Sequence, residues 1–199
     1  MNKKFKESPK VLGLDVSTKT IGWALFDIQT KQLLELSHIS PVPKPKEENK
    51  IKELLLKSEI FRTKLLGYKD LGITKVIIEE PLLNSNNVYT ISTLMRFNTL
   101  ICKEVYDILG VVPEFISTYN SRRHAFPHLV QQNDKKKFVL FGGYPKDCDK
   151  KMIIWELVAK REPQIQWHYT KNNTLKKENF DQTDAYCCVL GFMKQEEIW

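Results

Sequence analysis

The sequence lacks the features that mark membrane, secreted and zinc-binding proteins. No apolar run among its 199 residues approaches the length of a membrane span, and residues 1–9 form a basic tail without the apolar segment of a secretory signal. The 4 cysteines form no CxxC pair and show no zinc-ligand spacing. These absences predict a protein of a reducing compartment with no membrane association, and we expect it to act in the cytoplasm.

The composition is that of a globular protein with an excess of positive charge. Hydrophobic residues make up 42% and charged residues 28% of the chain, and the length suits one domain over residues 1–199. The formal net charge of +7 favours a polyanionic partner, with nucleic acid ahead of an anionic membrane surface. Charge alone does not decide the matter, because many basic domains bind neither.

Two of the predicted strands end on carboxylates. Residues 10–27, KVLGLDVSTKTIGWALFD, predict two strands joined as a hairpin, with Asp15 near the end of the first. Residues 75–80, KVIIEE, predict a strand that is buried on both faces and ends on Glu79 and Glu80. An isolated carboxylate at the end of a strand is costly to desolvate. For Asp15, hydrogen bonds from the following turn amides are an alternative explanation.

The remaining predicted elements are strands and helices separated by loops. Further strands are expected at 32–40 and 113–118, and helices at 49–67, 88–109, 150–160 and 180–193. The most basic and least patterned part, residues 120–147, is interpreted as a flexible flap or loop. The last helix carries Asp181 and Asp184 on the same side of its first turn. An N-cap and a partner for the helix dipole would also explain these two aspartates.

The order of the predicted elements is that of an RNase H-like α/β domain with a five-stranded mixed sheet flanked by helices. In that fold the first and fourth strands are neighbours, so Asp15 would lie beside Glu79 or Glu80. The last helix would supply Asp181 and Asp184. Carboxylates gathered at one spot repel each other and are tolerated only with cations between them. Hard oxygen ligands favour Mg²⁺ or Mn²⁺, and two such ions form a site for phosphodiester hydrolysis.

Three segments resemble the acidic motifs of RuvC-like Holliday-junction resolvases, namely residues 10–27, 76–87 and 180–192. The LGLDVSTKTIGWA of the first segment is fairly specific, and the D-x-x-D-A of the third is the form seen in bacterial resolvases. The resemblance implies a catalytic site with two Mg²⁺ ions, for which Mn²⁺ would substitute, held by Asp15, Glu79, Asp181 and Asp184. Glu79 is preferred to Glu80 because the family's acid directly follows the apolar run and a strand points only one of two adjacent residues at a site.

The resemblance also implies a substrate and an assembly. Members of the family cut four-way DNA junctions symmetrically as homodimers, and the helix at 88–109 is the expected dimer surface. Lys151 falls where the family often has a catalytic basic residue near the scissile phosphate. The residues expected to contact DNA are Lys19, Arg122, Arg123, Lys135, Lys136, Lys137, Lys150 and Lys151.

Two departures from the family pattern affect the expected DNA contacts. Leu82 stands where the family often has an aromatic residue that acts on bases at the crossover. Residues 126–141 look longer than the matching part of the bacterial enzymes. This variation suits a phage-encoded or viral member that acts in a host cell.

The sequence also leaves other functions open. A broader branched-DNA or flap nuclease, or an RNase H-type nuclease, would use the same chemistry on another substrate. A junction-binding protein without activity would not need carboxylates at every motif position. The D-x-S-T-x-x-x-G pattern also resembles the first phosphate loop of sugar-kinase-like ATPases, but the second phosphate loop and the adenosine motif of those chains are not visible.

Overall fold

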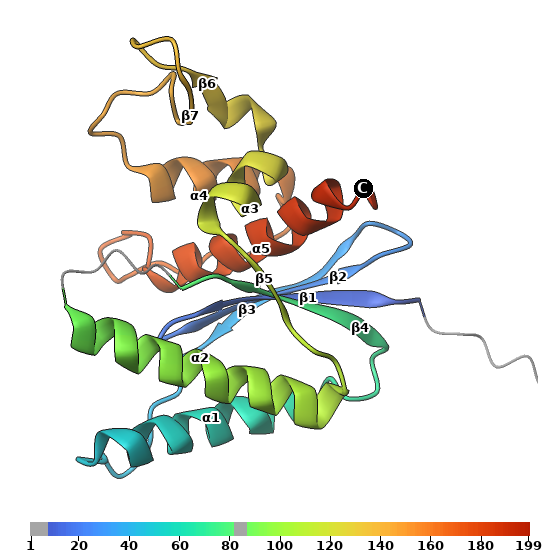
Figure 1. Ribbon diagram of the computed structural model, residues 1–199, viewed down its shortest axis with the longest axis vertical. Coiled ribbons are helices and arrows are strands. Elements are labelled where there is room, and N and C mark those ends of the chain that lie inside the picture. The colour runs from blue at the N-terminus through green and yellow to red at the C-terminus, as the bar shows by residue number, and fades with distance from the viewer. Residues whose placement is uncertain (1–7, 82–86) are drawn as a thin grey trace, which may run out of the picture.

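Five strands form one mixed sheet at the centre of the molecule. The computed structural model describes residues 8–81 and 87–199 (Figure 1). In sheet order the strands are β3 (Leu33–Ile39), β2 (Ile21–Asp27), β1 (Lys10–Val16), β4 (Ile73–Glu79) and β5 (Glu114–Ile116). The first three strands of the chain are antiparallel, and β1, β4 and β5 run parallel to one another. The predicted RNase H-like α/β fold is therefore confirmed.

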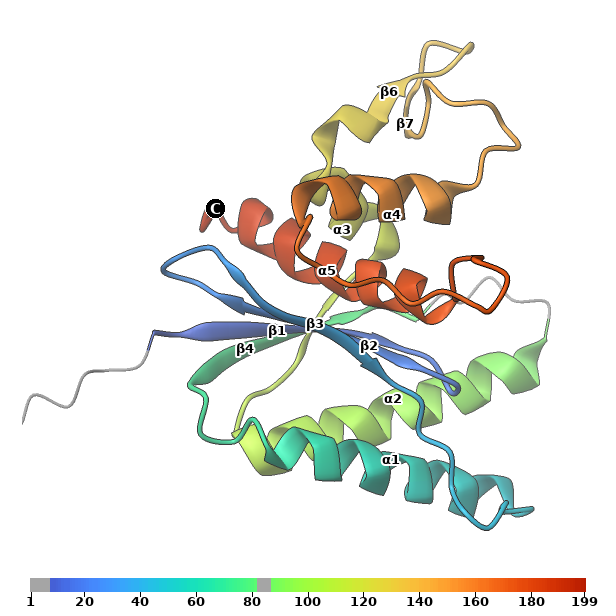
Figure 2. The same ribbon diagram turned by 180° about the vertical axis from the view of Figure 1, so that it is seen from behind.

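Helices cover both faces of this sheet. On one face lie α1 (Lys50–Leu66) and α2 (Val88–Leu109), and on the other α5 (Glu178–Gln195) lies across the strands. Two shorter helices, α3 (Thr118–Ala125) and α4 (Lys150–Arg161), pack on the outer side of α5 (Figure 2). In the described part of the chain, none of the helices combines the length and apolar character needed to cross a membrane.

Successive residues of β1 alternate between two hydrophobic cores. Leu12 and Leu14 are fully buried in the core that includes α1 and α2, whereas Val11 belongs to the core built around α5. Gly13 also faces α5, because a Cβ at this position would overlap the backbone of that helix. The same alternation places Asp15 on the α5 side of the sheet.

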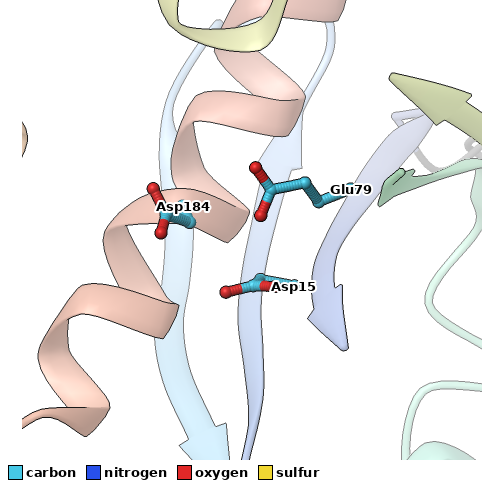
Figure 3. A group of neighbouring side chains, drawn as sticks. All are labelled: Asp15, Glu79 and Asp184. Carbon is cyan, nitrogen blue, oxygen red and sulfur yellow. The ribbon is translucent and has the colours of Figure 1, made fainter. Parts of the chain in front are cut away.

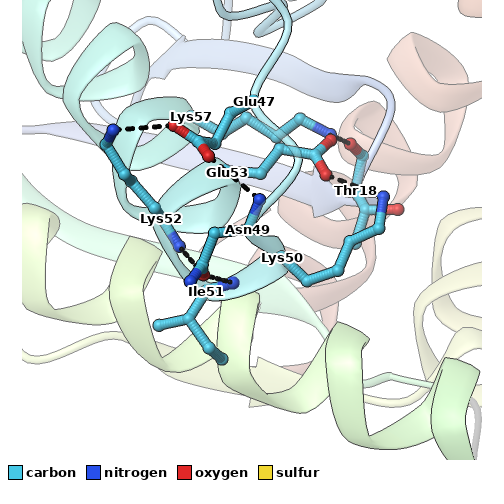
Figure 4. Close-up of polar contacts among 8 residues, drawn as sticks. All are labelled: Thr18, Glu47, Asn49, Lys50, Ile51, Lys52, Glu53 and Lys57. Atoms are coloured by element: carbon cyan, nitrogen blue, oxygen red, sulfur yellow. Dashed lines mark hydrogen bonds and ion pairs between the residues drawn. The ribbon is translucent and has the colours of Figure 1, made fainter.

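The polar end of α1 is tied to the turn between β1 and β2. Asn49 caps α1 by accepting from the backbone amides of Ile51 and Lys52, at 3.0 and 3.1 Å. About two turns further along, Lys57 donates to the carbonyl oxygen of Thr18 at 2.8 Å (Figure 4). The turn that follows Asp15 is thus held by a neighbouring helix as well as by its own strands.

The last helix is longer and more enclosed than expected. It begins at Glu178 instead of Phe180, so Asp181 lies in its first turn and Asp184 in its second. Its N-cap residue is Lys177, without a side-chain capping bond, so neither aspartate serves as the N-cap. Every residue from Gln182 to Met193 is buried, because the sheet covers one side of α5 while α3 and α4 cover the other.

Part of the predicted flap, residues 120–147, has regular structure. Its first residues belong to α3, which leads into the 3₁₀ helix η1 (Pro127–Leu129). A two-stranded antiparallel sheet follows, formed by β6 (Val130–Gln132) and β7 (Phe138–Leu140). The expectation of a loop from residue 120 onward was therefore wrong for α3. Its sequence is mostly polar, but it forms a helix that packs on α5.

Close approach of α5 to the sheet depends on Gly22. A Cβ at this position would overlap the carbonyl group of Asp181, so we expect Gly22→Ala to lower the free energy of unfolding by about 2 kcal/mol. Gly67→Ala is the matched control, because Gly67 has right-handed helical φ and ψ angles and its new Cβ would meet only ordinary contacts. Urea unfolding of both variants tests this, and equal stability of the two would contradict the packing argument.

Candidate metal centre

Two neighbouring strands present the first two carboxylates of the site. β1 and β4 are parallel and in register at Leu14 and Ile78, so the residues that follow, Asp15 and Glu79, emerge side by side. Ile77 belongs to the core around α5, and Glu79, two residues on, therefore faces α5 as well. Glu80 is exposed and lies outside the acidic group. The geometry thus favours Glu79 over Glu80.

Asp184 completes the group from α5. Asp15, Glu79 and Asp184 each offer one carboxylate oxygen, and these oxygens all lie within 4.8 Å of one another. Figure 3 shows the three side chains pointing toward one another from the two strands and the helix. The backbone amides of Lys19 and Thr20 donate to the Ser17 hydroxyl oxygen, at 3.3 and 3.0 Å. These turn amides, which were the alternative hydrogen-bond donors for Asp15, therefore bond to Ser17 instead.

The electrostatics of the group favour a divalent cation. Burial raises the pKa of Asp15 well above its usual range, and repulsion from Glu79 and Asp184 raises it further. Burial and the charge of Asp184 also raise the pKa of Glu79. Both pKa shifts mean that ionisation of these carboxyl groups destabilises the folded protein when no cation is bound. Hard oxygen donors in this arrangement fit Mg²⁺ or Mn²⁺, which would offset the cost.

Asp181 stands slightly apart from the other three carboxylates. It lies one turn before Asp184 and is not within the 4.8 Å group. Burial raises its pKa to about 6, while Lys151 and the Thr20 hydroxyl act in the opposite direction. Asp181 still lines the same cleft, a cavity of about 450 Å³, so it remains available to a cation or to a bound substrate there.

Arg122 occupies an unexpected place in the site. It projects from α3, and its Nη2 donates to Asp184 Oδ1 at 2.7 Å. The exposed fractions of the two side chains are only 11% and 6%, so this is a buried charge pair. The expectation that Arg122 follows DNA phosphates on a surface flap does not fit this position. The Ser117 N-cap and the basic last turn of α3 were the local signals of a helix here.

The other predicted DNA-contacting residues are exposed. Lys19 lies in the turn between β1 and β2, Arg123 lies on α3, and Lys150 and Lys151 begin α4. Lys151 lies 3.9 Å from Asp184 Oδ2 with 53% of its side chain exposed, so its ammonium group can reach both the carboxylate and solvent. The remaining three, Lys135, Lys136 and Lys137, lie between β6 and β7. Leu82, where an aromatic residue was expected, lies outside the described residues.

The raised pKa of Asp181 predicts a pH-dependent stability. The folded state holds the Asp181 proton more tightly than the unfolded state, so its contribution to stability is present below pH 4 and is lost as pH rises through about 6. In EDTA, Asp181→Asn is expected to become more stable than the parent by about 1 kcal/mol at pH 7, after allowance for partial exposure, and by much less at pH 4.5. Urea unfolding at the two pH values measures this difference. A difference that does not grow with pH would contradict it.

Comparison with known proteins supports the fold. No family model and no curated protein matches the chain. Among solved structures, RuvC of Thermus thermophilus in complex with a Holliday junction substrate superposes with a TM-score of 0.62, at 10% identity over 94% of each chain. A second structure of Thermus thermophilus RuvC gives a TM-score of 0.57, at 11% identity over 94% of this chain and 96% of that one. The chain therefore has a RuvC-like fold, and at this identity the likeness extends to the fold alone.

Proposed function

We propose that the protein is a metal-dependent endonuclease that resolves four-way DNA junctions by paired symmetric nicks. The observation that carries this proposal is the group of Asp15, Glu79 and Asp184, whose oxygens lie within 4.8 Å of one another at the carboxyl ends of β1 and β4 in a RuvC-like sheet. A net charge of +7 on the whole chain supports a nucleic acid as the substrate.

The carboxylates and the nearby cations have separate roles in this proposal. Asp15, Glu79 and Asp184, with Asp181 beside them, would hold two Mg²⁺ ions, which activate water and stabilise the leaving oxygen when bound. Arg122 holds Asp184 in place through their 2.7 Å contact. Lys151, which is half exposed beside the cleft, contacts the phosphate to be cut.

The proposed enzyme is a homodimer that pairs two such sites through α2. Val88, Met95 and Tyr106 lie 7 and 11 residues apart along this helix, which puts them on one face, and their exposed fractions are 79%, 45% and 57%. This row of uncovered apolar side chains suits a second copy of the chain. A dimer places one site on each of the two strands that must be cut.

Cleavage of three labelled DNAs in Mg²⁺ tests the proposed function. The substrates are a mobile four-way junction, a flap and a linear duplex, and Asp15→Asn is the control. Paired symmetric nicks in the junction alone, lost in the variant, are the expected result. Equal cutting of flap and junction would indicate a broader branched-DNA nuclease, and added cutting of an RNA–DNA hybrid would indicate an RNase H-type enzyme. Junction binding without cleavage in Mg²⁺ or Mn²⁺ would overturn the catalytic proposal.

A further inference from the structure

The hairpin formed by β6 and β7 contributes little to the packing of the domain, since Leu140 is its one residue that packs against the core around α5. Its two strands form a sheet separate from the central one, and it extends beyond α3 and α4 at the end of the molecule away from α1 (Figure 1, Figure 2). Its base is anchored, because Leu129 and Phe141 are buried in the core around α5 and the Phe141 amide donates to the Leu129 carbonyl at 2.7 Å. The hairpin is therefore a projecting element on a rigid base.

The turn at the end of the hairpin has a defined conformation. Asn133 accepts through its side-chain oxygen from the amides of Lys135 and Lys137, each at 3.0 Å. The Asn133 amide donates to the Lys137 carbonyl at 2.9 Å, which closes the turn. Lys136 adopts a left-handed φ of 56° between them. The three lysines, of which Lys136 is the middle one, are thus presented on an ordered turn.

Phe138 is the unusual feature of this surface. Its exposed fraction is 69%, which no other aromatic side chain of the described residues exceeds. It directly follows the three exposed lysines, Lys135 to Lys137, and pairs across the hairpin with exposed Gln132. A solvated charged turn explains the lysines but gives no reason for an uncovered phenyl ring. An aromatic ring beside cations is the combination that binds unpaired bases together with their phosphates.

The hairpin is continuous with the acidic cleft through Lys150. This residue lines the cleft together with Asp15 and Asp184, and it also lines a second hollow beside the hairpin. Its ammonium group lies 5.9 Å from the ring centre of Phe141 at the base of β7. A DNA strand leaving the cleft along Lys150 would therefore run toward the hairpin.

We propose that the β6–β7 hairpin is a second DNA-contacting element, in which Phe138 stacks on a base left unpaired where the arms of branched DNA meet. Lys135, Lys136 and Lys137 hold the flanking phosphates. This assignment rests on the proposed function, because it takes the substrate of the acidic cleft to be branched DNA. It gives the exposed ring a partner and makes the hairpin a determinant of branch selectivity.

Equilibrium binding in EDTA, where no strand is cut, tests the hairpin independently of catalysis. The probes are a four-way junction with 2-aminopurine at the crossover and a linear duplex of the same length. Phe138→Ala is expected to weaken junction binding about tenfold, to leave duplex binding within about twofold, and to abolish the change in 2-aminopurine fluorescence. Phe138→Tyr should keep all three properties, and Gln132→Ala serves as the control on the paired strand.

The role of the three lysines is tested by the salt dependence of DNA binding. Replacement of Lys135, Lys136 and Lys137 by alanine is expected to weaken binding of both DNAs and to lower the salt slope by about 2 to 3. Unchanged junction binding by Phe138→Ala, or equal losses for junction and duplex, would overturn the stacking proposal while the proposed function stands. A parent protein without preference for the junction would overturn both. Thermal unfolding of each variant confirms that the exposed substitutions leave the fold intact.

Discussion

Asp15→Asn and Glu79→Gln are each expected to lower the rate of junction cleavage at least about a thousandfold, whereas Glu80→Gln lowers it less than about tenfold. A missing metal ligand removes several kcal/mol of charge stabilisation from the transition state, and about 4 kcal/mol corresponds to a thousandfold. Asp15 and Glu79 belong to the close group of oxygens, while the neighbouring Glu80 is exposed and lies outside it. Single-turnover cleavage in saturating Mg²⁺ measures the rates.

Asp15→Asn and Glu79→Gln should stabilise the metal-free protein, which separates loss of activity from loss of folding. The pKa of Asp15 is raised by burial and by the neighbouring carboxylates, so its ionised form destabilises the folded state at neutral pH. Asp15→Asn is therefore expected to unfold at higher urea concentration than the parent in EDTA. Cleavage by Asp15→Asn above a tenth of the parent rate, or equal losses for Glu79→Gln and Glu80→Gln, would contradict the assignment.

Strand alternation allowed part of this site to be predicted from the sequence. A residue that follows a buried run must face one side of the sheet or the other, so only one of Glu79 and Glu80 could join Asp15. The order of elements also predicted the parallel pairing of β1 with β4, which the structure confirms. These features depend on short-range periodicity and on topology, and both can be recognised in a single chain.

The contribution of α3 could not be predicted in the same way. α3 has only eight residues, and its sequence TYNSRRHA has no apolar face that would indicate a helix. It is stabilised by packing on α5, where Ser121 lies so close to Gly191 that a Cβ on the glycine would overlap it. The Ser117 N-cap and the basic last turn of α3 are local signs of a helix, but a long-range contact of this kind leaves no sequence pattern that would show where the helix packs. The pairing of Arg122 with Asp184, 62 residues apart, was missed for the same reason.

Arg122→Met is expected to lower the free energy of unfolding of the metal-free protein by about 3 kcal/mol, because it removes the hydrogen-bonded partner of the buried Asp184 carboxylate. Arg123→Met is the matched control, since Arg123 is exposed on the same helix and should change stability by less than about 0.5 kcal/mol. Arg122→Lys should recover only part of the loss, because an ammonium lacks the planar donor geometry of the guanidinium. Urea unfolding in EDTA measures all three variants.

A double-mutant cycle then tests whether the loss comes from Asp184. In Arg122→Met combined with Asp184→Asn, the unpaired charge is gone, so the double variant should be more stable than Arg122→Met alone. Saturating Mg²⁺ should also restore part of the stability of Arg122→Met, because a cation bound by Asp15, Glu79 and Asp184 compensates the same carboxylate. If neither Asp184→Asn nor Mg²⁺ reduces the loss, Arg122 stabilises α3 through packing alone and does not hold Asp184 for the metal centre.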